Sequence, residues 1–187
     1  MSQGEQDIRA ILSTKRYSSR SFPGYRFTPG RDPHPTASPH GHSYRAPGTP
    51  EERVDCPPPE RWGSCEEYLY GCDLYNHGYW WEAHEAWEAL WHVPEKGSVQ
   101  KRFLQGIIQV AACHLKLLLG RRDGVVRLRA SSQEHLRAAI QGIGGLRYMG
   151  LDVRAFQAGA DAYLEARLVG MGRPVHEWER FPYIVLA

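Results

Sequence analysis

The amino-acid sequence predicts an all-α protein, a bundle of about five helices preceded by an irregular, proline-rich N-terminal arm. Two observations indicate this class. From residue 65 onward, apolar side chains recur three and four positions apart, which is the spacing of one face of a helix. No pair of alternating segments joined by a hairpin turn interrupts this pattern, so we expect no sheet.

The N-terminal arm is the region where regular structure is not expected. Residues 18–59 hold ten of the thirteen prolines, a density that excludes helices and central strands. We therefore divide the chain into an arm, residues 1–59, and a helical domain, residues 60–187. The arm contains Tyr25, Phe27 and Tyr44, and aromatic side chains are unusual in a free linker. Whether the arm packs on the domain stays open at this point.

Five helices are expected in the domain, and residues with capping preferences mark several of their ends. Asn76 and Gly78 separate the first two helices, because both residue types adopt the left-handed conformation that ends a helix. Ser98 and Asp152 are expected N-caps, and Gly120 is an expected stop. The expected helices are residues 65–76, 79–92, 98–120 and 123–140, and a fifth that begins after Asp152. The third is apolar around most of its circumference and is expected to be central, and the apolar tail, residues 173–187, is expected to pack back on the bundle.

Composition argues against several classes of protein. The net charge is +2, with 23 basic and 21 acidic residues, so we do not expect a nucleic-acid partner for the domain. Contact with nucleic acid through the arm is a lesser alternative, since residues 14–50 hold six basic residues and one acid. The four cysteines lack the spacing of a disulfide scaffold, which favours a cytoplasmic location. Polar residues interrupt the most apolar segment, residues 103–119, so no membrane span is expected.

The segment 79–92 has the most unusual composition in the chain, with four tryptophans, two histidines and three glutamates in fourteen residues. On a helix with about 100° per residue, its apolar face consists of Trp80, Ala83, Trp87, Leu90 and Trp91. His84 and Glu88, at positions i and i+4, lie on the shoulder of this face and are expected to lean toward the core. Glu85 is expected to point toward solvent. Trp81 lies off the apolar face and is a candidate for the wall of a cleft.

Two segments together carry a resemblance to a known family. The run from Leu74 to Trp91, Leu-Tyr-Asn-His-Gly-Tyr-Trp-Trp-Glu-Ala-His-Glu-Ala-Trp-Glu-Ala-Leu-Trp, is followed by Arg102-Phe-Leu-Gln-Gly-Ile-Ile-Gln. This pairing resembles the small helical family called domain of unknown function 309, over roughly residues 66–146. The resemblance implies a helical bundle and brings no activity or substrate. Its pattern falls here on Asn76, Tyr79, His84, Glu85, Glu88, Trp91, Gln105, Gly106, Gln109 and His114.

Two interpretations of these residues are retained. In the first, the domain is a binding or structural module, and its polar cluster orders the bundle or holds a small ligand or a divalent metal ion. The residues of this expected cluster are Asn76, Tyr79, Trp81, His84, Glu88, Gln105 and Gln109. In the alternative, the domain is a metal-dependent hydrolase, because His-Glu-x-x-Glu resembles the His-Glu-x-x-His zinc helix. His84 and Glu88, with His114 as a further candidate, would then be the metal ligands, and Glu85 the catalytic general base.

Overall fold

Helices make up the regular secondary structure of residues 15–50, 54–170 and 181–187, the part of the chain that the computed structural model describes. The elements are the 3-10 helix η1 (Pro59–Ser64) and the α-helices α2 (Glu66–Asn76), α3 (Trp80–Trp91), α4 (Val99–Leu118), α5 (Arg122–Gly142) and α6 (Val153–Val169). Two isolated bridges are the only β pairing in these ranges. The predicted all-α class with five long helices is therefore confirmed, whereas the short η1 is not predicted by the sequence pattern.

The ends of the helices follow from the expected capping residues. The side chain of Ser98 accepts the backbone N–H three residues later at 3.2 Å, and Asp152 does the same at 2.9 Å. Gly78 and Gly120 have φ angles of 78° and 63°, in the left-handed region that favours glycine. Local sequence therefore determines where α4 and α6 begin and where α2 and α4 are followed by a turn.

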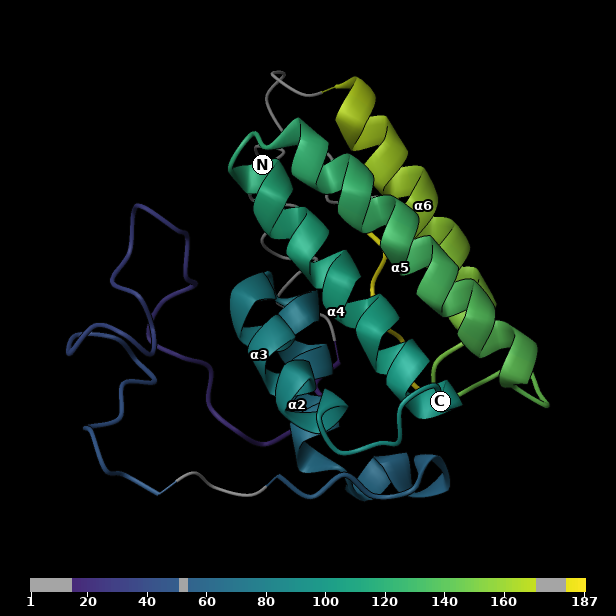
Figure 1. Cartoon of the computed structure of the whole chain (residues 1–187), viewed down its shortest axis with the longest axis horizontal. Coiled ribbons are helices and arrows are strands. Elements are labelled where there is room, and N and C mark those ends of the chain that lie inside the picture. The colour runs from purple at the N-terminus through teal and green to yellow at the C-terminus, as the bar shows by residue number, and fades with distance from the viewer. Residues whose placement is uncertain (1–14, 51–53, 171–180) are drawn as a thin grey trace.

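Helix α4 lies at the centre of the bundle, between α3 on one side and α5 and α6 on the other (Figure 1). Trp87 of α3 is fully buried against α2, and a Cβ atom at Gly71 would overlap its indole ring. A Cβ atom at Gly106 of α4 would lie 2.6 Å from the side chain of Leu136 on α5. These two glycines therefore allow neighbouring helices to approach α2 and α4 closely.

The C-terminal tail, residues 181–187, packs back on the bundle. Phe181 is 5% exposed, and its ring lies close to aromatic rings of α2, α3, α4 and α6. The buried side chain of Asn76 at the end of α2 holds the tail through both backbone groups of Ile184. Residues 181–187 thus lie against the bundle, whereas Trp178 lies outside the described ranges.

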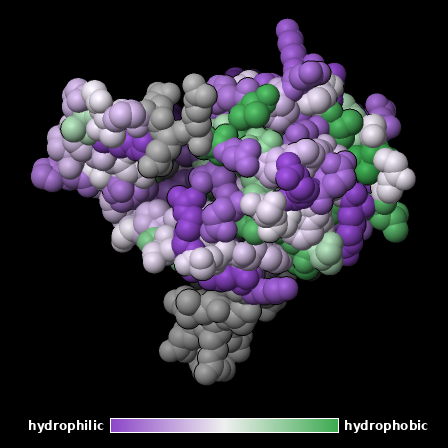
Figure 2. Space-filling model, turned by 90° about the horizontal axis from the view of Figure 1, so that it is seen from below, coloured by the Kyte–Doolittle hydropathy of each residue, from purple (hydrophilic) through white to green (hydrophobic). Residues whose placement is uncertain are grey.

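Residues 15–50 and 54–58 of the arm have no helix or strand, and the arm lies to one side of the bundle as a largely hydrophilic lobe (Figures 1 and 2). Two buried carboxylates attach it to the helices. Asp73 of α2 accepts the backbone N–H groups of Tyr17 and Ser18, both at 2.9 Å. Glu82 of α3 accepts the backbone N–H of Phe27 at 2.8 Å. The arm therefore packs on the domain, while the division of the chain at residue 59 stays a prediction.

Within the described ranges, no helix is both long and apolar enough to span a lipid bilayer.

All four cysteines are free, and Cys65, Cys72 and Cys113 are buried. Burial raises the pKa of Cys65 to about 11 and that of Cys113 to about 12, so these thiols are protonated at neutral pH. They therefore act as small apolar core residues. The cytoplasmic location stays a prediction.

Candidate functional site

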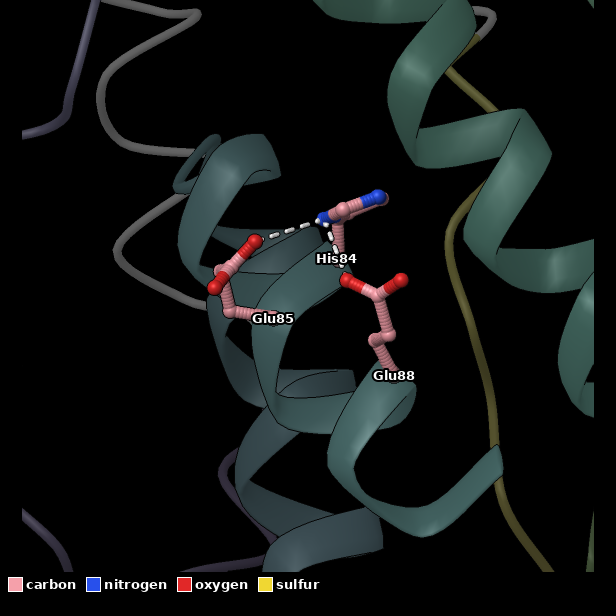
Figure 3. Close-up of side chains that lie close together, drawn as sticks. All are labelled: His84, Glu85 and Glu88. Carbon is pink, nitrogen blue, oxygen red and sulfur yellow. Dashed lines mark hydrogen bonds and ion pairs between the residues drawn. The ribbon is translucent and has the colours of Figure 1, made fainter. Parts of the chain in front are cut away.

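Three polar side chains of α3 lie together on its outer side: His84, Glu85 and Glu88, called here the α3 cluster (Figure 3). Nδ1 of His84 is 3.1 Å from Oε1 of Glu85 and 3.9 Å from Oε2 of Glu88. One potential ligand atom from each residue lies within 4.8 Å of the other two. The side chains are 27%, 41% and 44% exposed, in that order. The cluster thus offers one imidazole and two carboxylates within five consecutive residues, open to solvent.

The exposure of the α3 cluster corrects the expected orientation of the helix. His84 and Glu88 were expected to lean toward the core and Glu85 away from it, but Glu88 is no more buried than Glu85. The buried face of α3 is rotated toward Glu82 and Ala86, both of which are buried. This rotation arises because the arm and α2 cover that side of α3. The shoulder of the apolar face that contains His84 and Glu88 is therefore left partly open.

His114 lies apart from the α3 cluster, so its expected place beside His84 and Glu88 is also corrected. It is 1% exposed on the inner side of α4. Its ring stacks on Trp80 with 4.9 Å between centroids, and its Nε2 is 3.1 Å from the hydroxyl oxygen of Tyr75. His114 is therefore a core residue with a hydrogen-bond partner, and it offers no open nitrogen to the cluster.

The burial of His114 makes stability depend on pH. Loss of solvation, with a smaller contribution from the charge of Arg167, lowers the pKa of His114 from 6.5 to about 3. Below pH 6.5 the unfolded chain binds a proton that the folded protein does not bind until about pH 3. The free energy of unfolding is therefore expected to fall as the pH decreases across this window. Urea unfolding of the wild type and of His114→Gln, measured between pH 7 and about 4, checks this.

The variant is expected to lose much of this pH dependence, because glutamine does not titrate and retains a polar group near Tyr75. His40→Gln is the matched control, since His40 is exposed. It should leave the pH profile unchanged. A profile for His114→Gln that parallels the wild type would contradict the assignment.

Asn76 and Tyr79, expected in a single polar cluster with His84, attach peripheral segments to the domain instead. The amide oxygen of Asn76 accepts the N–H of Ile184, and its amide nitrogen donates to the C=O of the same residue, both at 2.8 Å. Tyr79 stacks on Phe22 of the arm with 5.0 Å between ring centroids, and the guanidinium of Arg26 lies 5.1 Å from its ring. Asn76 therefore holds the tail, and Tyr79 contacts the arm.

Gln105 and Gln109 of α4 are also separate from the α3 cluster. Gln105 lines a hollow of about 230 Å³ together with Trp91, Lys101 and His135. The amide oxygen of Gln109 is buried without a hydrogen-bond partner in the described ranges. No hydrogen bond within those ranges joins either glutamine to the α3 cluster. The expected polar cluster is therefore divided among the tail contact, the arm contact, α3 and α4.

A cleft of about 390 Å³, called here the arm cleft, lies between the arm and helices α2 and α3. Trp81 lines it, as the sequence suggested, and its ring meets those of Phe27 and His42 edge-on at 5.3 and 6.4 Å. Glu82 and Glu85 line the same cleft. Because Glu85 also belongs to the α3 cluster, the two features adjoin each other.

Sequence reasoning missed Glu82 and His42 as residues of this region. Glu82 is 6% exposed, and Nε2 of His42 lies 3.0 Å from its Oε1. Glu82 stands on the side of the predicted helix opposite Trp80, where a carboxylate is expected to be solvated. Its burial depends on arm residues 40 and 55 positions away in the sequence. No local pattern around Glu82 could have indicated it.

These features define a class of protein: an all-helical domain with a polar cluster on α3 and an N-terminal arm packed against α2 and α3. The model of the family called domain of unknown function 309 matches residues 68–128, which extend from α2 into α5. The resemblance predicted from the sequence is thus confirmed over this segment, which contains the whole of α3 and α4. Searches of the curated proteins and of the solved structures found no match.

Proposed function

We propose that this domain binds a divalent metal ion through the α3 cluster, next to a cleft that accepts a small ligand. The observation that carries the proposal is the approach of His84, Glu85 and Glu88, whose potential ligand atoms lie within 4.8 Å of one another. Imidazole and carboxylate groups together suit zinc, manganese and iron. All three side chains come from one helix, so folding of α3 alone brings them together.

The half-exposed position of the cluster supports an open metal site. Partly solvated carboxylates require little desolvation before they bind a cation, in contrast to buried ones. Three protein ligands leave at least one coordination position for water or a ligand, as in catalytic zinc sites. The two glutamates face the His84 imidazole at 3.1 and 3.9 Å, so only modest side-chain rotations are needed to direct all three groups at one ion.

Titration of the purified protein with Zn²⁺ or Mn²⁺, followed by calorimetry, tests this proposal. We expect about one equivalent to bind, and we expect His84→Ala and Glu88→Gln each to weaken binding about tenfold or more, since each removes a ligand. Glu134→Gln is the control, because Glu134 is an exposed carboxylate of α5. It should leave binding unchanged. Wild-type affinity in His84→Ala would refute the site.

Glu85 favours a second candidate function, a metal-dependent hydrolase. It lies within hydrogen-bonding distance of His84 and also lines the arm cleft, so a substrate in the cleft would lie beside it. As general base it would accept a proton from the attacking water, while His84 and Glu88 hold the metal. Glu85→Gln distinguishes a metal ligand from a general base when metal binding and hydrolysis are both measured. Weaker metal binding indicates a ligand, whereas unchanged metal binding with loss of bis(p-nitrophenyl) phosphate hydrolysis indicates a base.

The arm is not proposed as a nucleic-acid site. Three of its arginines, Arg16, Arg20 and Arg31, pair with the carboxylates of Asp73, Glu67 and Asp32. Their charges are thus partly neutralised within the protein, which reduces the positive field available to a phosphate backbone.

A further inference from the structure

We infer that the arm cleft binds a small organic cation, of which an alkyl diamine is the simplest form, with Glu82 as its principal anionic contact. This site is distinct from the α3 cluster, although Glu85 borders both. The inference rests on the charge of the cleft, the unused acceptor of Glu82 and the aromatic walls.

The charge of the cleft favours a cation. Three carboxylates line it, those of Glu67, Glu82 and Glu85, and Arg20 is the one guanidinium among its lining residues in the described part of the chain. Arg20 is already paired with Glu67, and its guanidinium lies 4.0 Å from the centre of the Tyr70 ring. The other two carboxylates have no permanently charged partner in the described ranges. The charge of Glu67 is thus neutralised by Arg20, whereas those of Glu82 and Glu85 are not neutralised by a lysine or arginine of the described ranges.

Glu82 provides the specific contact. Its side chain is only 5% exposed. Oε1 accepts the N–H of Phe27 at 2.8 Å and lies 3.0 Å from Nε2 of His42. Oε2 has no hydrogen-bond partner in the described residues. A buried carboxylate with an unused acceptor is unfavourable unless a donor or a positive charge lies near it. An ammonium group in the cleft, which Glu82 lines, supplies a positive charge beside this carboxylate.

The size and the walls of the cleft favour an organic cation over a bare metal ion. Its volume of about 390 Å³ falls within the range typical of small-molecule sites. Trp81, Tyr70 and Phe22 line it together with Leu74, so both an alkyl chain and a cation–π contact can be accommodated. Arg20 over Tyr70 shows the same type of contact within the protein. A small hydrated ion would use neither the volume nor the apolar surface of this cleft.

Calorimetric titration of the full chain with 1,5-diaminopentane, in metal-free buffer of low ionic strength, tests the inference. We expect the diamine to bind and the equally long 1,5-pentanediol and glutarate not to bind, because they lack the positive charge. Glu82→Gln should weaken diamine binding about tenfold or more, since it removes a charge-assisted hydrogen bond. Glutamine retains an acceptor for Phe27, so the arm stays attached. Trp81→Leu, which removes an aromatic wall without changing charge, should also weaken binding.

Controls separate this site from the proposed metal site. Glu134→Gln removes an exposed carboxylate far along the chain on α5 and should bind the diamine as the wild type does. His84→Ala should bind the metal ion more weakly and the diamine as the wild type does, whereas Glu82→Gln should bind the diamine more weakly and the metal ion as the wild type does. Equal binding of the diol, wild-type affinity in Glu82→Gln, or loss of diamine binding in His84→Ala would each overturn the inference.

Discussion

Replacement of Asn76 with alanine is expected to lower the free energy of unfolding by about 2–4 kcal/mol, because two buried backbone groups lose their partners. The Asn76 side chain is fully buried, and its amide bonds the N–H and C=O of Ile184, both at 2.8 Å. Alanine satisfies neither group. Equilibrium urea unfolding measures the change, and hydrogen exchange at the Ile184 amide should become faster, since that amide loses its acceptor.

Gln141→Ala is the control for this change, because Gln141 is an exposed amide on α5. It should alter the free energy of unfolding by no more than about 0.5 kcal/mol. A similarly small loss in Asn76→Ala, with exchange at Ile184 unchanged, would show that Asn76 does not hold the tail.

Replacement of Trp87 with alanine is expected to cost about 3–5 kcal/mol, the range for truncation of a large core aromatic side chain. Trp87 is fully buried, its Nε1 donates to the carbonyl of Tyr68 at 3.3 Å, and its indole lies directly against Gly71. Truncation would leave a cavity between α2 and α3 and would remove the hydrogen bond of the indole. Thermal and urea unfolding measure the loss.

Trp81→Ala is the matched control, since Trp81 is a tryptophan of the same helix that is only partly buried at the arm cleft. The loss of stability in Trp81→Ala should be smaller than in Trp87→Ala, because fewer apolar contacts are removed from a site that solvent already reaches. Equal losses in the two variants would contradict the assignment of Trp87 to the core and Trp81 to the cleft wall.

Much of the fold was predictable because helix formation is local. Apolar spacing identified five helices, and capping residues such as Ser98, Asp152 and Gly120 placed several of their ends. These effects act within one or two turns of the chain. The family resemblance adds the succession of the α3 and α4 motifs along the chain, and the family model matches residues 68–128, which contain both helices.

The candidate site was predicted less well, because its composition depends on contacts between distant segments. Sequence spacing placed His84 and Glu88 together on one helix, but it directed Glu85 away from them, whereas the structure brings all three together. His114 was expected among the ligands from its residue type, but the core around Trp80 encloses it. A helical wheel shows which residues share a face, and it does not show which part of that face remains in water.

The sequence by itself determined the five long helices, several of their ends, the family resemblance and the i, i+4 spacing of His84 and Glu88, since each of these depends on local sequence. Only the tertiary structure decided which side of α3 is buried. The arm covers Glu82, the tail binds the Asn76 side chain, and the α3 cluster is left at the surface. Burial is the sum of contacts between distant segments, such as the contact of Asn76 with Ile184, 108 positions later, and local pattern carries no information about those contacts.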